Sequence, residues 1–188
     1  MTPYRTAEAR WFRPGEVPAD VRAWFEGIGP APEPEARTDR YLAPASPALG
    51  VKLREGRVEA KRRTATLAPL AAGRAEAAVE AWAKWSFAVE GAPLAAPAGG
   101  DDAGEGDWVA VRKVRQQHHA EGCALELARV EMDGRPWWSV CLEATGPTDD
   151  ARRAALGRAA EWLARPDAPA LAAADAQGYP AWLIGRRA

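Results

Sequence analysis

Residues 50–63 read GVKLREGRVEAKRR, and the dipeptide Glu55-Gly56 at their centre favours a two-residue β-hairpin turn, because glycine accepts positive φ. Folding two strands about this turn places Lys52 opposite Glu59 and Leu53 opposite Val58. Because alternate residues of a strand share a face, the hairpin has one charged face and one apolar face. The charged face carries Lys52, Arg54, Arg57, Glu59 and Lys61, and the apolar face carries Val51, Leu53, Val58 and Ala60.

The charged face of this hairpin is mostly basic. Like charges that face one another across two strands are unfavourable, so such a face needs either water or an anion. We therefore predict that it lines an anion-binding site. The alternative is a solvated sheet face, since runs of charge usually face water.

Length and composition predict one domain over residues 1–188, with a C-terminal helix and tail (about 147–188) packed on it. The chain is 47% hydrophobic and has a net charge of −1, so neither nucleic acid nor a membrane is expected as a partner. The N-terminal residues do not predict a signal peptide, and no apolar run approaches the ~20 residues of a spanning helix. Two cysteines, Cys123 and Cys141, make no disulfide framework of the secreted kind. The expected location is cytoplasmic.

Lysine is rare in this chain. Of its 25 basic residues only Lys52, Lys61, Lys84 and Lys113 are lysine, and the others are arginine. Arginine and lysine differ in geometry and hydration, so positions that keep lysine in an arginine-rich chain indicate a need for a compact ammonium group. All four lie in segments that the sequence predicts to be strands.

The remaining elements follow from periodicity and turn signals. Strands are predicted over residues 8–13, 38–43, 79–88 and 108–117, and helices over 18–27 and 149–165, the second capped by Thr148 or Asp149. Residues 64–90 are ambiguous, because alanine favours helix while residues 80–87 alternate with a period of two. Residues 91–107 predict a long mobile loop. The tail is expected to dock Tyr179, Trp182 and Leu183 on the rest of the domain.

A second hairpin is predicted over residues 123–145, with Asp133-Gly134 as its turn. Its apolar face holds Leu125, Leu127, Val140 and Leu142. Glu126 and Glu143 lie on the other face as a diagonal pair, roughly 7–8 Å apart. Two carboxylates this close repel each other unless a metal ion or a basic side chain of another strand lies between them, and the sequence leaves both options open.

The tryptophans and histidines can be explained by structural roles as well as by functional ones. Trp82 and Trp137 alternate with the polar face, where they would stack on a ring or plug one end of a barrel. A protein-interaction barrel, in which Trp24, Trp85 and Trp138 bury a partner, competes with their burial in a core. His118 and His119 point in opposite directions from a strand end, so they do not predict a shared metal.

Eight strand candidates with charged faces on one common surface predict an α+β fold: an eight-stranded antiparallel β-barrel, or tunnel, with a charged interior and helices on the outside. A barrel of this size can enclose a small ligand, and an excess of basic groups inside it favours phosphate groups. The predicted inner residues are Glu8, Arg10, Arg40, Lys52, Arg54, Glu59, Lys61, Lys84, Lys113, Arg115, Glu126 and Glu143.

The segments KLREGRVEAKRR (52–63), WAKWSF (82–87), WVAVRKVRQQ (108–117) and LELARVEMDGRPWWSVCLEA (125–144) together resemble the CYTH superfamily, the triphosphate tunnel metalloenzymes. The resemblance covers about residues 8–146. It implies an antiparallel tunnel that binds a triphosphate, polyphosphate or nucleotide with Mg²⁺ or Mn²⁺. The implied phosphate ligands are Arg10, Arg40, Lys52, Arg54, Lys61, Lys84, Lys113 and Arg115. The implied metal ligands are Glu8, Glu126 and Glu143, of which Glu126 and Glu143 would also take the catalytic role.

The first strand departs from the pattern of that superfamily. Where the superfamily has Glu-x-Glu-x-Lys, residues 6–10 read Thr-Ala-Glu-Ala-Arg, so one carboxylate is missing. Two functions therefore remain open. One is metal-dependent hydrolysis of a phosphoanhydride, in which a carboxylate-held metal polarises the phosphoryl group. The other is a non-catalytic phosphate or organic-anion binding module that has lost the metal site.

Overall fold

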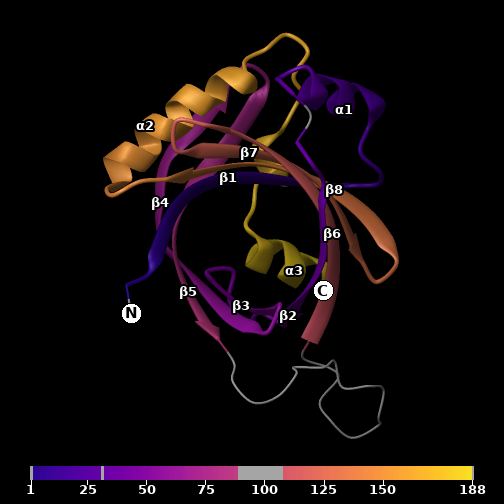
Figure 1. The fold of residues 1–188 in the computed structure, drawn as a ribbon, viewed down its shortest axis with the longest axis vertical. Helices are drawn as coiled ribbons and strands as arrows, with labels where there is room; N and C mark the ends of the chain where they lie inside the picture. Colours follow the sequence, from indigo (N-terminus) through magenta and orange to yellow (C-terminus); the bar gives the residue numbers. More distant parts are fainter. Residues whose placement is uncertain (1, 31, 89–107, 188) are drawn as a thin grey trace, which may run out of the picture.

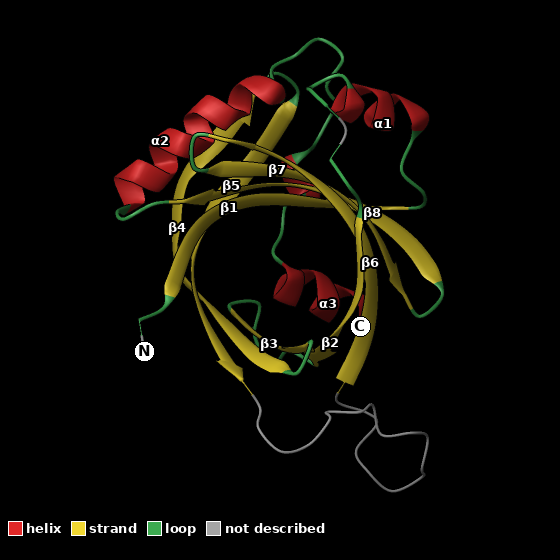
Figure 2. Ribbon diagram, in the orientation of Figure 1, coloured by secondary structure: helices red, strands yellow, loops and turns green. Residues whose placement is uncertain are grey.

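A computed structural model describes residues 2–30, 32–88 and 108–187, and in it eight strands close into one barrel in which all neighbouring strands are antiparallel (Figures 1 and 2). The order around the barrel is β1-β5-β4-β3-β2-β6-β7-β8. The strands are β1 (Tyr4–Pro14), β2 (Glu35–Leu42), β3 (Leu49–Arg54), β4 (Arg57–Ala72), β5 (Ala75–Ala88), β6 (Trp108–Ala120), β7 (Cys123–Met132) and β8 (Arg135–Thr145), and the helices are α1 (Ala19–Glu26), α2 (Asp149–Ala159) and α3 (Tyr179–Arg187). The loop predicted over 91–107 lies outside the described residues.

Both predicted hairpins have the predicted register. Lys52 pairs with Glu59 across β3 and β4, and Glu126 pairs with Cys141 across β7 and β8. The turns use left-handed backbone, with φ of 47° at Glu55 and 51° at Asp133, each followed by a glycine with positive φ. These are the conformations that two-residue hairpin turns require.

The ambiguous stretch after residue 63 forms one long hairpin. β4 continues to Ala72 and β5 begins at Ala75, four residues before the predicted start. The pairing shifts register between Arg63 and Ala65 and again between Leu67 and Leu70. Alanine's helix propensity is worth only a few tenths of a kcal/mol per residue. The two strands instead pair along their length, and the outer sides of Ala75, Ala77 and Val79 are buried in a core.

The main hydrophobic core lies outside the barrel, as the sequence predicts. Leu125, Leu127, Val140 and Leu142 point outward and pack with residues of α1 and α2, which cover this side in Figure 1. Thr148 caps α2 by accepting a hydrogen bond from the backbone N–H of Ala151. Trp24 and Trp138 are 1% and 4% exposed in this core, so the prediction that these two bury a partner protein is wrong. Trp85, the third residue of that prediction, is half-buried on β5.

His118 and His119 lie within β6 rather than after it, and they point in opposite directions as predicted. The His118 ring packs on Phe25 of α1, and its Nε2 lies 3.0 Å from the Phe25 carbonyl oxygen. His119 is exposed.

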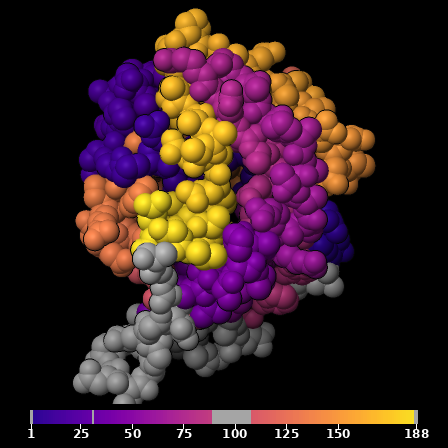
Figure 3. All heavy atoms as spheres, turned by 180° about the vertical axis from the view of Figure 1, so that it is seen from behind, coloured from indigo at the N-terminus to yellow at the C-terminus, as the bar shows by residue number. Residues whose placement is uncertain are grey.

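A second apolar cluster fills one end of the barrel interior. It combines inward side chains of the strands with Trp182 and Leu183 of α3, and it includes Phe12, Tyr41, Val111, Ala128, Val130, Met132 and Trp137. Trp137 therefore helps to plug one end of the barrel, one of the two roles predicted for it. Trp82 is fully buried beside Gly178, just before α3. Seen from behind, the C-terminal segment lies across this end (Figure 3).

The tail is thus a docked helix, with Tyr179, Trp182 and Leu183 against the barrel as expected. Pro180 occupies its first turn, where a missing N–H is tolerated. Within the described part of the chain, no helix is long and apolar enough to cross a membrane.

Candidate functional site

The other part of the barrel interior is a charged chamber of about 190 Å³. Eight basic and five acidic side chains line it, so positive charges exceed negative ones by three. The basic residues are Arg10, Arg37, Lys52, Arg54, Lys61, Lys84, Lys113 and Arg115, and the acidic residues are Glu8, Asp39, Glu59, Glu126 and Glu143. The chamber shares Lys84, Arg115 and Glu143 with a wider opening of about 610 Å³ at its mouth.

All four lysines of the chain line this chamber. Of the predicted phosphate-binding residues, seven lie in it: Arg10, Lys52, Arg54, Lys61, Lys84, Lys113 and Arg115. Arg40 does not. It pairs with Leu53 in the register of β2 and β3 and does not line the chamber, so its predicted placement inside was wrong.

Asp39 and Arg37 of β2 are charged chamber residues that the sequence did not reveal. The side chains of Asp39 and Tyr41 point inward and that of Arg40 points outward. The strand carries basic residues on both faces, so alternation alone could not orient it. The pairing of Tyr41 with Lys52 sets the face, because Lys52 belongs to the charged side of the hairpin.

Asp39 is the centre of the first ion cluster. Its two carboxylate oxygens each accept a hydrogen bond from the Arg54 guanidinium, both at 2.7 Å, and Lys52 Nζ lies 3.3 Å from Oδ2. Lys52 also lies 3.2 Å from the Glu59 carboxylate. Burial alone would raise the pKa of Asp39, but Arg54 and Lys52 hold this pKa well below its usual range. Asp39 is therefore ionised at neutral pH.

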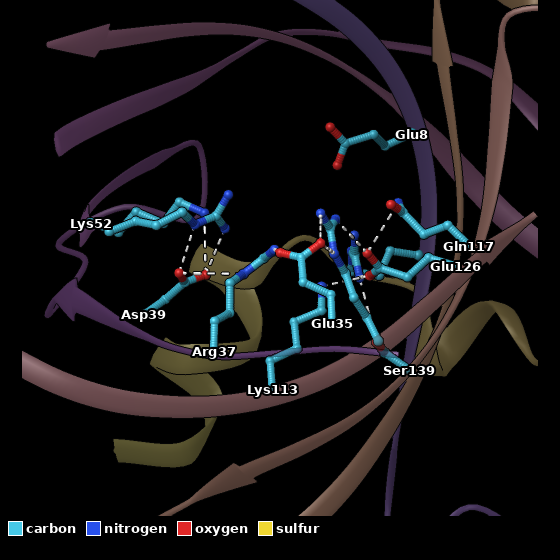
Figure 4. Close-up of polar contacts among 12 residues, drawn as sticks. Glu8, Glu35, Arg37, Asp39, Lys52, Lys113, Gln117, Glu126 and Ser139 are labelled. Atoms are coloured by element: carbon cyan, nitrogen blue, oxygen red, sulfur yellow. Dashed lines mark hydrogen bonds and ion pairs between the residues drawn. The ribbon is translucent and has the colours of Figure 1, made fainter. Parts of the chain in front are cut away.

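Glu126 is the centre of the second cluster, which Figure 4 shows on the opposite side of the chamber from Asp39. Its carboxylate accepts hydrogen bonds from Lys113 at 2.6 Å, Arg10 at 2.8 Å and Arg115 at 3.2 Å. Burial alone would raise the pKa of Glu126, yet Lys113 and Arg10 hold it well below its usual value. Arg115 also bonds the Glu35 carboxylate, at 2.7 Å, so three cations meet two carboxylates on this side and leave one positive charge available to an anion.

Burial lowers the pKa of both Lys52 and Lys113 to about 8, even though each has a carboxylate beside it. The cause is desolvation, which disfavours the charged form of an amine. Each lysine is therefore close to losing its charge just above neutral pH. An anion in the chamber would favour the protonated form.

Glu8 and Glu143 face each other on the paired strands β1 and β8. Lys61 Nζ lies 2.6 Å from both Glu8 oxygens, and Thr6 donates a hydrogen bond to Glu8 at 2.7 Å. Glu143 forms no hydrogen bond or ion pair among the described side chains. Burial raises the pKa of Glu143, and the negative charge of Glu8 raises it further. Lys61 therefore pairs with Glu8, while Glu143 faces Glu8 without a bonded cation among the described residues.

The three glutamates predicted to ligate a metal are not brought together. Within residues 2–30, 32–88 and 108–187, no three His, Cys, Asp or Glu side chains form a cluster that could hold a metal ion. Three cations bond Glu126, and Lys61 bonds both oxygens of Glu8. Mg²⁺ often takes only one or two carboxylates together with phosphate and water oxygens, so a hard cation could be held at Glu143 and Glu8, where it would displace Lys61 from Glu8.

Known proteins include some with a similar fold, but none that assigns this chain to a family. No protein-family model matches the chain, and no curated protein matches it. A conserved hypothetical protein from Pyrococcus furiosus has a similar structure, with a TM-score of 0.50 at 13% identity over 94% of this chain and 98% of that one. The PH1012 protein from Pyrococcus horikoshii OT3 gives 0.49 at 19% identity, over 92% and 94% of the two chains. The S. pombe Pct1 RNA triphosphatase gives 0.44 at 11% identity, over 99% and 80%.

These observations define the class of the molecule by its architecture. It is a closed, eight-stranded antiparallel barrel that is charged within one part of its interior and covered by helices on its outside. The structure with a TM-score of 0.50 is only 13% identical to this chain, so that likeness extends to the fold alone.

Proposed function

We propose that the chamber binds a short, phosphorylated anion: a triphosphate, a polyphosphate or the phosphate end of a nucleotide. The observation that carries this proposal is the excess of three positive charges in one enclosed space, with all four lysines of the chain in it. Buried like charges are strongly unfavourable unless a counter-charge meets them. A phosphate chain offers several negative charges and many hydrogen-bond acceptors along a narrow path.

The two ion clusters give this path two walls. Lys52 and Arg54 bond Asp39 on one side, and Arg10, Lys113 and Arg115 bond Glu126 on the other. Figure 4 shows Asp39 and Glu126 on these two sides. Arginine presents a planar fork of donors to phosphate oxygens, and lysine presents a compact charge. Their carboxylate partners hold these groups in place before the anion arrives, which reduces the ordering needed on binding.

Hydrolysis of the bound anion is a second candidate function, favoured by the facing pair Glu8 and Glu143. Bound there, Mg²⁺ or Mn²⁺ would polarise a phosphoryl oxygen as a Lewis acid. The chain's own contribution would be to hold the cation through Glu8 and Glu143 and to stabilise developing charge through Arg10, Lys61 and Arg115. The loss of a carboxylate at Thr6 favours the non-catalytic form of the proposal.

Titration calorimetry with tripolyphosphate and ATP tests the proposal, once with EDTA and once with Mg²⁺. Binding in EDTA without phosphate release in Mg²⁺ or Mn²⁺ supports a binding module. Phosphate release in the presence of metal supports the hydrolase. Absence of binding to both ligands under both conditions, with well-folded protein, would contradict the proposed function.

A further inference from the structure

The inner end of the chamber is made by the C-terminal helix rather than by the barrel. Tyr179 and Pro180, the first residues of α3, line the chamber together with strand residues. Figure 1 shows α3 within the outline of the barrel, and Figure 3 shows the C-terminal segment covering this end from behind. The chamber therefore has a mouth at one end and a floor at the other.

This floor is fixed to the barrel by backbone hydrogen bonds. β1 pairs with β5 only from Tyr4 to Glu8, and beyond that point the tail runs between the two strands. Leu171 accepts a hydrogen bond from the Glu76 N–H at 2.9 Å, and the Gln177 N–H donates to the Arg10 carbonyl at 2.8 Å. A Cβ at position 178 would lie 2.9 Å from the Trp82 ring, so this close passage requires glycine. These contacts hold α3 in place as the floor of the chamber.

Tyr179 presents an unused polar group to the chamber. Its hydroxyl oxygen is buried and has no hydrogen-bond partner among the described residues. Its ring lies beside two cations, with its centroid 5.1 Å from Arg10 Cζ and 5.5 Å from Lys113 Nζ. The ring also stacks on Tyr41 at 5.3 Å and meets Phe12 edge-on at 4.9 Å, so packing fixes its direction.

A buried hydroxyl without a partner is unfavourable, and here it lies next to the basic groups that would attract an anion. Burial raises the pKa of Tyr179, so the phenol keeps its proton and can donate a hydrogen bond. The N-terminal end of α3, where its dipole is positive, lies at the same place.

We propose that Tyr179 is a specificity-determining residue: its hydroxyl donates a hydrogen bond to the innermost oxygen of the bound phosphate chain, and α3 stops the chain there. The proposal rests on the proposed function. It adds that the ligand enters from the mouth with one free phosphate end leading, so that a chain substituted at both ends is excluded.

Calorimetry on the full chain with Tyr179→Phe tests the hydrogen bond. The variant keeps the ring that packs on Tyr41 and Phe12, so the melting temperature should not fall. A hydrogen bond to a charged group predicts that tripolyphosphate binds roughly tenfold or more weakly. Thr38→Val, which removes an exposed hydroxyl from β2 outside the chamber, is the control and should bind as the wild type does.

A second comparison tests the closed end with the wild-type protein. Tripolyphosphate and ATP each have a free phosphate end and should bind, whereas diadenosine triphosphate has none and should bind at least tenfold more weakly than ATP. Equal affinity for ATP and diadenosine triphosphate, or equal affinity of wild type and Tyr179→Phe for tripolyphosphate, would overturn the inference while leaving the proposed function intact. Failure of the wild type to bind any of them would instead contradict the proposed function.

Discussion

At the scale of single residues, the side chains of the chamber differ in how firmly they are already paired. Lys61, Arg54 and Lys113 each lie within 2.7 Å of a carboxylate oxygen. Lys84 lines both the chamber and its mouth, and it forms no ion pair within the described part of the chain. Removing a paired cation leaves a buried carboxylate without a counter-charge, which destabilises the folded protein. Removing Lys84 leaves no carboxylate without its ion-pair partner.

Lys84→Ala should therefore weaken tripolyphosphate binding by roughly tenfold, about 1.4 kcal/mol, while the melting temperature stays the same or rises slightly. Arg40→Ala is the matched control, because Arg40 lies on β2 outside the chamber and its loss should change neither property. Calorimetry and thermal unfolding measure both. Equal loss of affinity in the two variants would mean that only the overall charge of the protein matters.

Glu143→Gln should raise the melting temperature at neutral pH by a few degrees. A carboxyl whose pKa is raised in the folded protein destabilises it above the unfolded pKa of 4.5, because the folded state must lose a proton that it holds more tightly. The amide removes the repulsion from Glu8. The gain over wild type should shrink as the pH falls toward and below 4.5, because the wild-type carboxyl then becomes protonated in both states.

Thermal unfolding of both proteins across pH 4.5 to 8 measures this difference. A gain that is constant over that range would show that the charge of Glu143 is not its cause. Lys61→Ala would act in the opposite sense, since Lys61 is the ion-pair partner of Glu8.

At the scale of elements, the seam between β2 and β3 depends most on side chains. Only two residue pairs register across it, Arg40 with Leu53 and Tyr41 with Lys52. Asp39 adds to this short pairing by bonding Arg54 and Lys52 of the neighbouring strand. The carboxylate therefore links two strands and also positions two cations of the chamber.

Asp39→Asn should destabilise the protein by about 3–5 kcal/mol, as expected when one partner of a buried ion cluster is removed. Amide exchange should become faster in β2 and β3 than in β7 and β8. Because the pKa of Asp39 is depressed, its contribution is present above the unfolded pKa of 3.8 and is lost as the pH falls below it. Wild type and variant should therefore converge in acid.

Hydrogen exchange and chemical denaturation at pH 7 measure this effect, and tripolyphosphate should recover part of the lost stability by pairing with Arg54 and Lys52. A variant as stable as wild type would mean that β2 and β3 are held by their outer faces instead.

The sequence predicted well those elements whose structure depends on residues that are close together in the chain. The two hairpins have a glycine at a turn with positive φ and strands that alternate strictly, so their register and both faces follow from the residues themselves. β2 could not be oriented, because Arg37, Arg40 and Asp39 put charge on both of its faces and only its pairing with β3 decides which face is inside. The length of β4 was missed for a related reason, since its alanines weakly favour helix and only pairing with β5 overrides this preference.

At the scale of the whole molecule, the same limit explains the floor of the chamber. The charged interior could be predicted because several strands each carry a basic face, and all four lysines lie there. The contribution of Tyr179 could not, because it depends on where a tail distant in sequence comes to rest. The residues next to Tyr179 in the sequence do not indicate that its side chain lies beside cations. Burial of Tyr179 and Trp182 could be predicted, whereas the proximity of Tyr179 to Arg10 and Lys113 could not.

The chamber as a whole should make anion binding depend on pH. Lys52 and Lys113 have pKa values of about 8 before the anion binds, and a bound phosphate chain raises both by favouring the charged amines. Binding therefore takes up protons near and above pH 8, and the affinity should fall as the pH rises through this value. Titrations in buffers of different ionisation enthalpy measure the proton uptake directly.

Lys113→Arg is the matched control for this prediction, because arginine stays charged throughout the range. The protonation of tripolyphosphate itself is the same for both proteins, so the difference between their pH profiles isolates the lysine. The profile of the variant should be flatter between pH 7 and 9.5, and its proton uptake smaller. Identical profiles would mean that Lys113 keeps its charge in the unoccupied chamber. In that case the nearby carboxylate of Glu126 would offset the effect of burial on the pKa of Lys113.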